Sequence, residues 1–241
     1  MTILLTLLIT GVIFVNGFTD APGAITGVVV TRTLSYRAAV LLAAGCNLLG
    51  IAVMAVWSAS VANTMLGLAG ASNAAAAHAA AALGAAMLSI IIFAVGAWYF
   101  GIPTSESHAL IAALAAGSLA IAGEADMRGW DKVAAGLVLS LVMGLLLGYL
   151  LQRFPGVMLA RLSPRTLGGT QILGASASAF MHGAQDGQKF IAVLVLAQMI
   201  LSARPRGDIA ILALYIPEEL PWALALGLGT LRAGGRRVDK V

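Results

Sequence analysis

Long apolar runs are the feature that most restricts what this chain can fold into. Three of them cover about residues 38–57, 133–151 and 209–228. Each is close to the roughly 20 residues that an α-helix needs to cross about 30 Å of hydrocarbon. Only 10% of the residues are charged, against about 25% in soluble domains. The sequence therefore predicts an all-α polytopic membrane protein. We interpret the basic residues behind its net charge of +4 as signals that orient the chain in the membrane, not as a nucleic-acid binding surface.

Two acidic motifs interrupt the apolar sequence. They are residues 16–23 (NGFTDAPG) and residues 182–189 (HGAQDGQK), and both read x-Gly-x-polar-Asp-small when aligned on Asp20 and Asp186. An ionised side chain at bilayer depth costs at least ~2.5–3.5 kcal/mol, so it usually faces a cavity or a partner. Glycine and proline next to such an acid favour an unwound helix. Broken helices at matching places in two halves indicate an inverted-repeat transporter.

Residues 79–122 form two apolar arms around a polar centre at residues 101–108 (GIPTSESH). This pattern predicts either a re-entrant hairpin or two full spans, and we expect its tip to lie at membrane depth near both motif acids. The three hydroxyl residues of the tip would cap the helix that follows it.

The basic residues of the loops predict the orientation of the chain. With the N-terminus outside, the three inside loops hold nine Lys and Arg residues and the three outside loops hold four, as the positive-inside rule favours. The predicted inside loops are 31–37, 152–169 and 231–241. The predicted outside loops are 58–78, 123–132 and 201–208. The two motif helices then run in opposite directions across the membrane, as in inverted repeats.

This topology divides the chain into three parts. Residues 1–132 are the first inverted repeat, with a broken helix, a helix and the hairpin. Residues 133–169 are a connecting helix and a cytoplasmic loop. Residues 170–241 are an incomplete second repeat.

The motif acids are the strongest candidates for chemistry. Carboxylates and unwound carbonyls are hard oxygen ligands that suit alkali or alkaline-earth ions, and a carboxylate can also carry a proton. The alternative is an acid that Lys189 or backbone amides satisfy only to fix the packing. The candidate cation-binding residues are Asp20, Asp186, Asn16 and Gln188.

Hydroxyls at the start of a helix, together with its exposed amides, make an anion site that needs no arginine. The alternative is an ordinary capped loop in water. Glu106 is unsuited to an anion site, so it either faces the cation, stays protonated or points to solvent. The candidate substrate-binding residues are Thr104, Ser105, Ser107, Gln185 and Thr19.

The other polar residues suggest no catalysis. His108 and His182 have too few partners to hold a metal and are interpreted as packing or hydrogen-bonding residues. Lys189 lies close enough to Asp186 to neutralise it, and it could equally touch an anionic substrate. Because the sequence has neither a P-loop nor a readable Ser-His-Asp arrangement, we expect no enzyme, no catalytic residue and no cofactor.

Taken together, these motifs resemble those of the inorganic phosphate transporter (PiT) family, which includes sulfate permeases. The matching segments are residues 16–24, 31–35, 101–110, 182–189, 229–230 and 234–237. The resemblance implies secondary active transport of inorganic phosphate by a multi-pass protein of the cell (inner) membrane, coupled to sodium or protons. Sulfate transport is one alternative. A non-transporting or partial subunit is another, and the partners would be a second copy or a complementing chain.

The chain departs from the family pattern at several positions. Thr19 stands where the family has Asn or His, Gln185 and Gly23 stand where it has Asn, and Glu106 stands where it has a hydroxyl residue. The resemblance also implies a second hairpin beyond Val241, mirroring residues 79–122.

Overall fold

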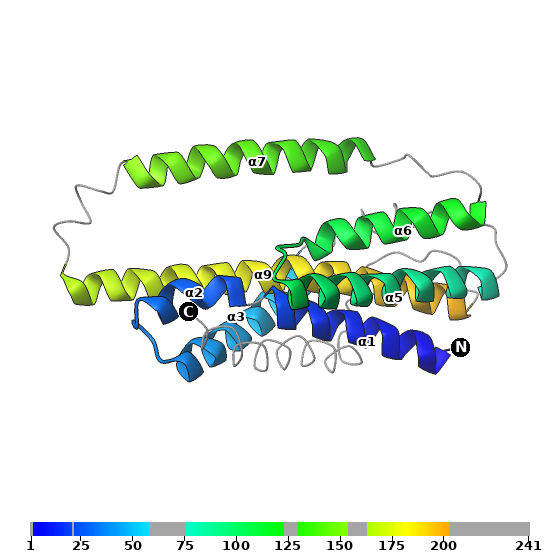
Figure 1. Cartoon of the computed structure of the whole chain (residues 1–241), viewed down its shortest axis with the longest axis horizontal. Coiled ribbons are helices and arrows are strands. Elements are labelled where there is room, and N and C mark those ends of the chain that lie inside the picture. The colour runs from blue at the N-terminus through cyan, green and yellow to red at the C-terminus, as the bar shows by residue number, and fades with distance from the viewer. Residues whose placement is uncertain (1, 21, 58–75, 123–129, 154–162, 203–241) are drawn as a thin grey trace.

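The computed structural model describes residues 2–20, 22–57, 76–122, 130–153 and 163–202, and the secondary structure of these residues is entirely helical (Figure 1). The helices are α1 (Thr2–Thr19), α2 (Pro22–Val30), α3 (Tyr36–Trp57), α5 (Ala76–Phe100), α6 (Glu106–Ala122), α7 (Trp130–Arg153) and α9 (Pro164–Ser202). The predicted helix at 209–228 and the basic tail at 231–241 lie outside the described residues.

Four helical segments are long and apolar enough to cross a membrane, which confirms the prediction of an all-α polytopic membrane protein. They are Ile3–Val30, Tyr36–Met54, Ala76–Phe100 and Trp130–Arg153. Helix α9 is longer than any of them, about 58 Å at 1.5 Å per residue, but it contains the polar residues of the second motif.

The first motif breaks its helix as the sequence predicts. Helix α1 ends at Thr19, and α2 begins at Pro22. Proline has no amide hydrogen and suits the first position of a helix, where that hydrogen would be unpaired in any case. A turn in which the Gly23 amide donates to the Asp20 carbonyl at 3.0 Å joins the two helices, so Asp20 lies at the break.

The second motif does not break its helix, which corrects the expectation of matching breaks in the two halves. Helix α9 continues from Pro164 to Ser202 through all of residues 182–189. It runs in the direction opposite to α1 (Figure 1), as expected for inverted repeats.

Close packing against α3 accounts for the continuous α9. A Cβ atom on Gly183 would lie 2.1 Å from the carbonyl oxygen of Asn47, and one on Gly50 would lie 2.1 Å from the carbonyl oxygen of Phe180. A Cβ atom on Gly187, four residues after Gly183, would lie 2.7 Å from the side chain of Ile51. Small residues at this spacing allow two membrane helices to approach backbone to backbone, and the contact requires a regular helix on both sides.

The predicted hairpin is present as α5 and α6. Helix α5 ends in a Schellman-type cap, in which the Ile102 amide donates to the Ala97 carbonyl at 2.9 Å and Gly101 has a positive φ of 70°. Ser105 precedes α6, and its hydroxyl accepts from the His108 amide at 3.5 Å. Helix α5 begins, and α6 ends, toward the end of the molecule where the N-terminus lies (Figure 1). The tip between them is near the middle of α9.

Two hydrophobic cores lie along α9, one on each side of the second motif. The first core joins α1, α5 and α6 to the C-terminal part of α9, with Met87 and Ile90 fully buried. The second core joins α2 and α3 to its N-terminal part, where Ala43 packs with Ala175 and Ala179. The motif acids therefore lie where the two cores meet.

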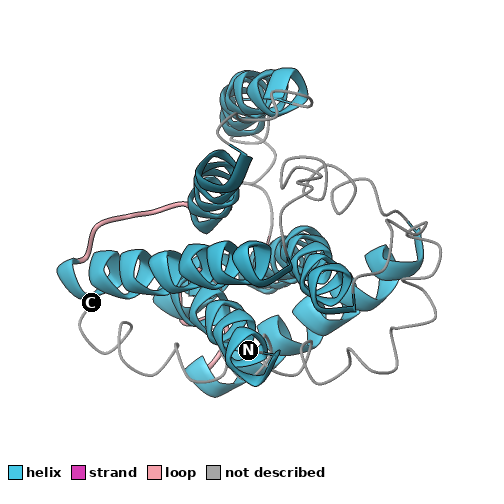
Figure 2. Ribbon diagram, turned by 90° about the vertical axis from the view of Figure 1, so that its right-hand side faces the viewer, coloured by secondary structure: helices cyan, strands magenta, loops and turns pink. Residues whose placement is uncertain are grey.

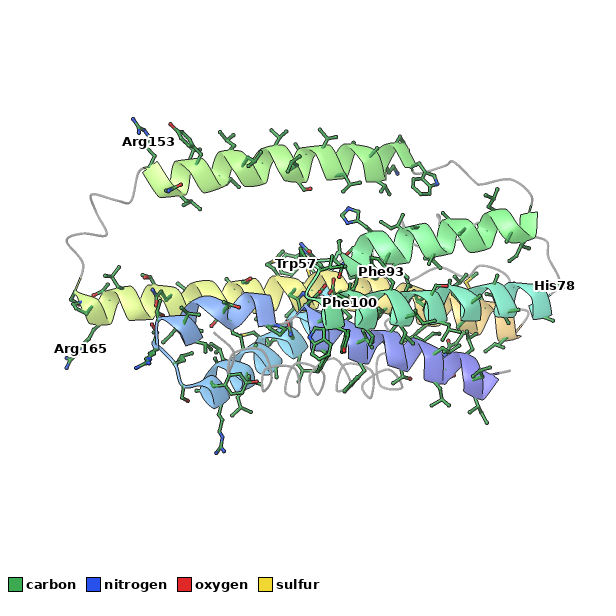
Figure 3. All side chains as sticks on the ribbon, in the orientation of Figure 1. Trp57, His78, Phe93, Phe100, Arg153 and Arg165 are labelled. Carbon is green, nitrogen blue, oxygen red and sulfur yellow. The ribbon has the colours of Figure 1, made fainter. Side chains whose placement is uncertain are left out.

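The ends of the molecule agree with the predicted grouping of the loops. Thr31 and Thr33 donate to the Gln171 side chain at 2.9 and 2.5 Å, so the predicted inside loop 31–37 lies beside the first turns of α9, next to the C-terminal end of the predicted inside loop 152–169. Arg153 and Arg165 lie at this end, and His78 lies at the opposite end (Figure 3). Which end faces the cytoplasm stays a prediction.

Helix α7 stands apart from the other helices, above α6 in Figures 1 and 2. None of its described residues is buried. Only its start approaches the bundle, where Trp130 and Val133 pack near Ala192 of α9. Its apolar surface is the kind that lipid covers.

Candidate substrate and cation site

The break after α1, the middle of α9 and the start of α6 bring their polar side chains together in one group, called here the acid cluster. Its members come from three segments far apart in the sequence, as the hairpin prediction requires. They are Asn16, Thr19, Asp20, Glu106, Ser107, His182, Asp186 and Lys189.

Asp20 is held by neutral groups of α1. The Asn16 amide donates to one carboxylate oxygen at 3.5 Å, and the Thr19 hydroxyl lies 3.4 Å from the other. The Thr19 hydroxyl also lies 3.0 Å from the Val15 carbonyl and contacts Glu106 Oε1. Thr19 thus connects the first motif to the hairpin tip.

The hydroxyl of Thr19 has a single proton and cannot donate to all of these oxygens at once. Two arrangements satisfy the contact with Glu106. Either Thr19 donates to an ionised Glu106, or a protonated Glu106 donates to Thr19, which then donates to the Val15 carbonyl. In the second arrangement both Glu106 Oε1 and the Val15 carbonyl oxygen take part in a hydrogen bond with Thr19, whereas in the first only the Glu106 oxygen does.

Glu106 is 3% exposed, which excludes the alternative that it points to solvent. Its second oxygen, Oε2, is buried without a hydrogen-bond partner among the described residues, and so is Asn16 Oδ1. Buried polar atoms in this state cost free energy unless they meet a ligand, a proton or water. The two remaining alternatives, a carboxyl that faces the cation or stays protonated, are both compatible with this environment.

Asp186 is held differently, by charged or chargeable groups. Lys189 Nζ donates to Asp186 Oδ1 and to the Ser107 hydroxyl, and His182 Nδ1 lies 3.4 Å from Asp186 Oδ2. The Asp186 and Lys189 side chains are only 7% and 12% exposed. His182 therefore contacts Asp186 through one ring nitrogen, and its Nε2 is buried without a hydrogen-bond partner among the described residues.

Two cavities border the cluster. A small one of about 10 Å³ lies between Asn16, Glu106, Ser107, Asp186 and Lys189, which is about the room for one water-sized particle. An open cleft of about 870 Å³ lies on the other side of Thr19. Of the described residues that line the cleft, Asp20 is the one with a charged side chain, and the hydroxyl residues are Thr19, Thr26, Thr104 and Ser105.

The candidate ligands predicted from the sequence do not all lie in the same place. Thr104 and Ser105 line the cleft, whereas Ser107 is bound to Lys189. Gln188 is 4% exposed. Gln185 is exposed on α9, and His108 is exposed on α6.

Trp98 is a cleft residue that the sequence reasoning missed. It lines the cleft close to the end of α5 and packs edge to face on Phe18, with ring centroids 4.7 Å apart. Its position could have indicated this role, because Trp98 is three residues before Gly101. A residue in the last turn of a helix before the hairpin tip borders the same space as the tip.

The described residues contain no group of three or more His, Cys, Asp or Glu side chains arranged to hold a metal ion. A small cation at the acid cluster would therefore need neutral oxygens, such as Asn16 Oδ1, beside the carboxylates.

Comparison with known proteins points to one family. The profile described as the phosphate transporter family matches residues 16–165, a range that contains the first motif and the hairpin tip. No solved structure matches the chain.

Curated relatives agree with this match. The chain is 29% identical over its whole length to a probable low-affinity inorganic phosphate transporter of Bacillus subtilis and spans 72% of that protein. It is 33% identical over 77% of its length to a protein of the same description from Streptomyces halstedii, of which it spans 88%. It is 28% identical over 80% of its length to the low-affinity inorganic phosphate transporter PitB of Escherichia coli and spans 44% of that protein.

Proposed function

Because this chain belongs to the phosphate transporter family, we propose that it carries inorganic phosphate across the cell membrane in symport with a cation, sodium or a proton. The relatives' descriptions support phosphate as the substrate. The arrangement of charges around the cleft supports the coupling, as argued below.

The observation that carries the proposal is the cleft between the helix break and the hairpin tip. Hydroxyls from both sides, Thr19 and Thr26 on one and Thr104 and Ser105 on the other, line a space of about 870 Å³. Hydroxyls and the amides at the start of α6 are donors that suit a tetrahedral oxyanion. Phosphate would be bound by Thr104 and Ser105, with Thr19 on the opposite side of the cleft. Ser107 lies outside the cleft lining, in contact with Lys189.

The same cleft contains a reason for cation coupling. Among the described residues that line it there is no Lys or Arg, whereas Asp20 is one of them. A phosphate anion beside this carboxylate is repelled, and the repulsion is strong where the local dielectric constant is low. A cation or a proton at Asp20 removes the repulsion, so the anion and the cation bind more tightly together than alone. That mutual dependence is the thermodynamic condition for symport.

Uptake by the purified full chain in proteoliposomes tests the proposal. Labelled phosphate uptake would be measured with an inward sodium gradient, with an inward proton gradient and with neither. We expect uptake with at least one gradient, and we expect Thr104→Ala together with Ser105→Ala to abolish it while leaving the protein folded. Val138→Ala, on the exposed surface of α7, is the matched control.

The outcome that contradicts the proposal is a folded chain that neither binds nor transports phosphate in either gradient. Uptake of sulfate in place of phosphate would instead support the sulfate alternative, since both anions are tetrahedral and the cleft donors are neutral. Competition by unlabelled sulfate in the same vesicles distinguishes the two anions.

A second chain is the remaining proposed partner, either another copy or a complementing chain. Crosslinking and native mass spectrometry of the vesicles that show uptake would identify the assembly. A chain that transports as a monomer would contradict a requirement for any partner.

A further inference from the structure

The two motif acids differ in how their charges are compensated. Asp20 is contacted by the neutral side chains of Asn16 and Thr19 and borders the open cleft. Asp186 contacts the ammonium of Lys189. A cation from solution has access to the first acid, whereas the second already has a covalently attached cation.

Helix geometry keeps the Lys189 ammonium beside Asp186. The two residues are three positions apart on α9, so their side chains share one face wherever the helix is intact. Because α9 is continuous and packs tightly on α3 at Gly183 and Gly187, the pair cannot separate by local unwinding without breaking that packing.

The surroundings of Lys189 resemble the oxygen shell of a small cation. Its Nζ donates to Asp186 Oδ1 and to the Ser107 hydroxyl. The cavity beside it, of about 10 Å³, is also lined by Asn16 and Glu106, whose Oδ1 and Oε2 atoms are buried without a partner among the described residues. These carboxylate, hydroxyl and amide oxygens are the hard ligands that a monovalent cation prefers.

The charged and titratable groups that face the Lys189–Asp186 pair come from three segments. Asp20 is at the break after α1, Glu106 is on α6, and His182 is on α9 with the pair itself. Lys189 is thus the one Lys or Arg residue in the acid cluster. A second cation placed in the small cavity would be repelled by its ammonium at close range.

We propose that Lys189 is a tethered counter-ion that occupies the cation position of the second motif, so that the chain binds its exchangeable cation at the Asp20 side alone. This inference rests on the proposed cation coupling and specifies which of the two acids takes part in it. Lys189 acts as a specificity-determining residue, because its charge sets how many cations the chain can bind.

Cation binding by the purified full chain without phosphate tests this inference separately from transport. The number of sodium ions bound per chain would be measured with radioactive sodium, and thermal unfolding would be followed against sodium concentration with choline keeping the ionic strength constant. The variants are Lys189→Met, which removes the charge, and Lys189→Arg, which keeps it. Lys132→Met removes the same charge from an exposed position on α7 and is the matched control.

We expect Lys189→Met to bind one more sodium ion per chain than the wild type, and its thermal stability to gain a sodium dependence that Lys189→Arg and Lys132→Met lack. Adding Asp186→Asn to Lys189→Met should remove the extra ion. If the coupling ion is a proton, the variant instead becomes more stable as the pH falls in the absence of sodium, because an uncompensated buried carboxylate is stabilised by protonation.

Equal sodium binding and an equal pH profile in Lys189→Met and the wild type would overturn the inference and leave Lys189 a packing residue. Should Lys189→Met fail to fold at low sodium, Lys189→Gln and refolding in a sodium or pH series decide the question, because recovery by either cation supports a cation position and recovery by neither contradicts it. A failure of phosphate transport with these binding results intact would contradict the proposed function and not this inference.

Discussion

In the first motif the helix ends at Thr19 and restarts at Pro22, whereas in the second motif α9 continues through residues 182–189. Both motifs place a glycine three residues before the acid, and the glycine of the second motif packs against α3. Gly183 touches the backbone of α3, while the first motif has a proline that starts a new helix. Similar local sequence therefore produces different backbones because the long-range contacts differ.

The two acids differ accordingly. Asp20 is half-buried at a helix break with neutral partners, and Asp186 is buried in a rigid helix with Lys189 as its ion-pair partner. This difference is the basis of our proposal that ions and substrate exchange at the first motif, whereas the second motif is a rigid part of the bundle. Four predictions test this division.

The largest effect is expected for Gly183→Leu. Even a Cβ atom at this position would lie 2.1 Å from the Asn47 carbonyl oxygen, so the larger side chain must separate α3 from α9. Overpacking of this kind usually costs about 1–3 kcal/mol, and more is expected where backbone meets backbone. We expect no folded protein in size-exclusion chromatography of detergent extracts. Gly174→Leu, on the same helix where a Cβ meets open space, should elute like the wild type.

Asp186→Asn should destabilise the chain far more than Asp20→Asn. Removing one member of a buried ion pair leaves the other charge uncompensated, at a cost of about 3 kcal/mol. Asp20 has no ion-pair partner among the described residues, so its replacement should cost about 1 kcal/mol or less. Thermal unfolding of both variants measures the difference. Equal losses of stability would contradict the assigned asymmetry, and Asp186→Asn with Lys189→Met should recover part of the loss.

Thr104→Ala and Ser105→Ala should each weaken phosphate binding at the cleft by about fivefold to tenfold, the effect of one hydrogen bond of about 1 kcal/mol. Isothermal titration with phosphate in detergent measures the affinity. Ser89→Ala is the control, because its hydroxyl is exposed and bonds to its own helix at the Ala85 carbonyl. If the affinity for phosphate is unchanged in both tip variants, these hydroxyls do not bind the anion.

The smallest effect is expected for Gln185→Ala, which should change the stability by less than about 0.5 kcal/mol, because the side chain is exposed. Gln188→Ala, in the next turn and 4% exposed, should cost about 1–2 kcal/mol as a buried polar group loses its contacts. Chemical denaturation of the two variants provides the comparison. A reversal of this order would show that the exposed face of α9 is covered in the assembled protein.

Much of this architecture could be predicted from the sequence, because it depends on local signals. Apolar run length predicts the spans, Pro22 predicts the helix break, and Gly101 with Pro103 predicts the hairpin tip. The prediction that the hairpin tip lies near Asp20 and Asp186 followed from placing the tip and both acids at the same depth in the membrane.

The remaining features depend on contacts between distant segments, which periodicity does not specify. Nothing local distinguishes Gly183, pressed against Asn47, from Gly174, which faces open space. The burial of Glu106 and the contact of Lys189 with Ser107 depend likewise on how α6 approaches α9. A helical pattern predicts which face is buried but not what lies against it.

The break between α1 and α2 separates segments that belong to different cores. Helix α1 packs with α5 and α6, and α2 packs with α3, whose Ile51 also reaches the first core. Helix α9 runs through both cores without interruption. A rotation of one core against the other about α9 would therefore change the backbone conformation at Asp20. Binding of an ion at the Asp20 carboxylate would then be coupled to the side of the membrane on which the cleft is open.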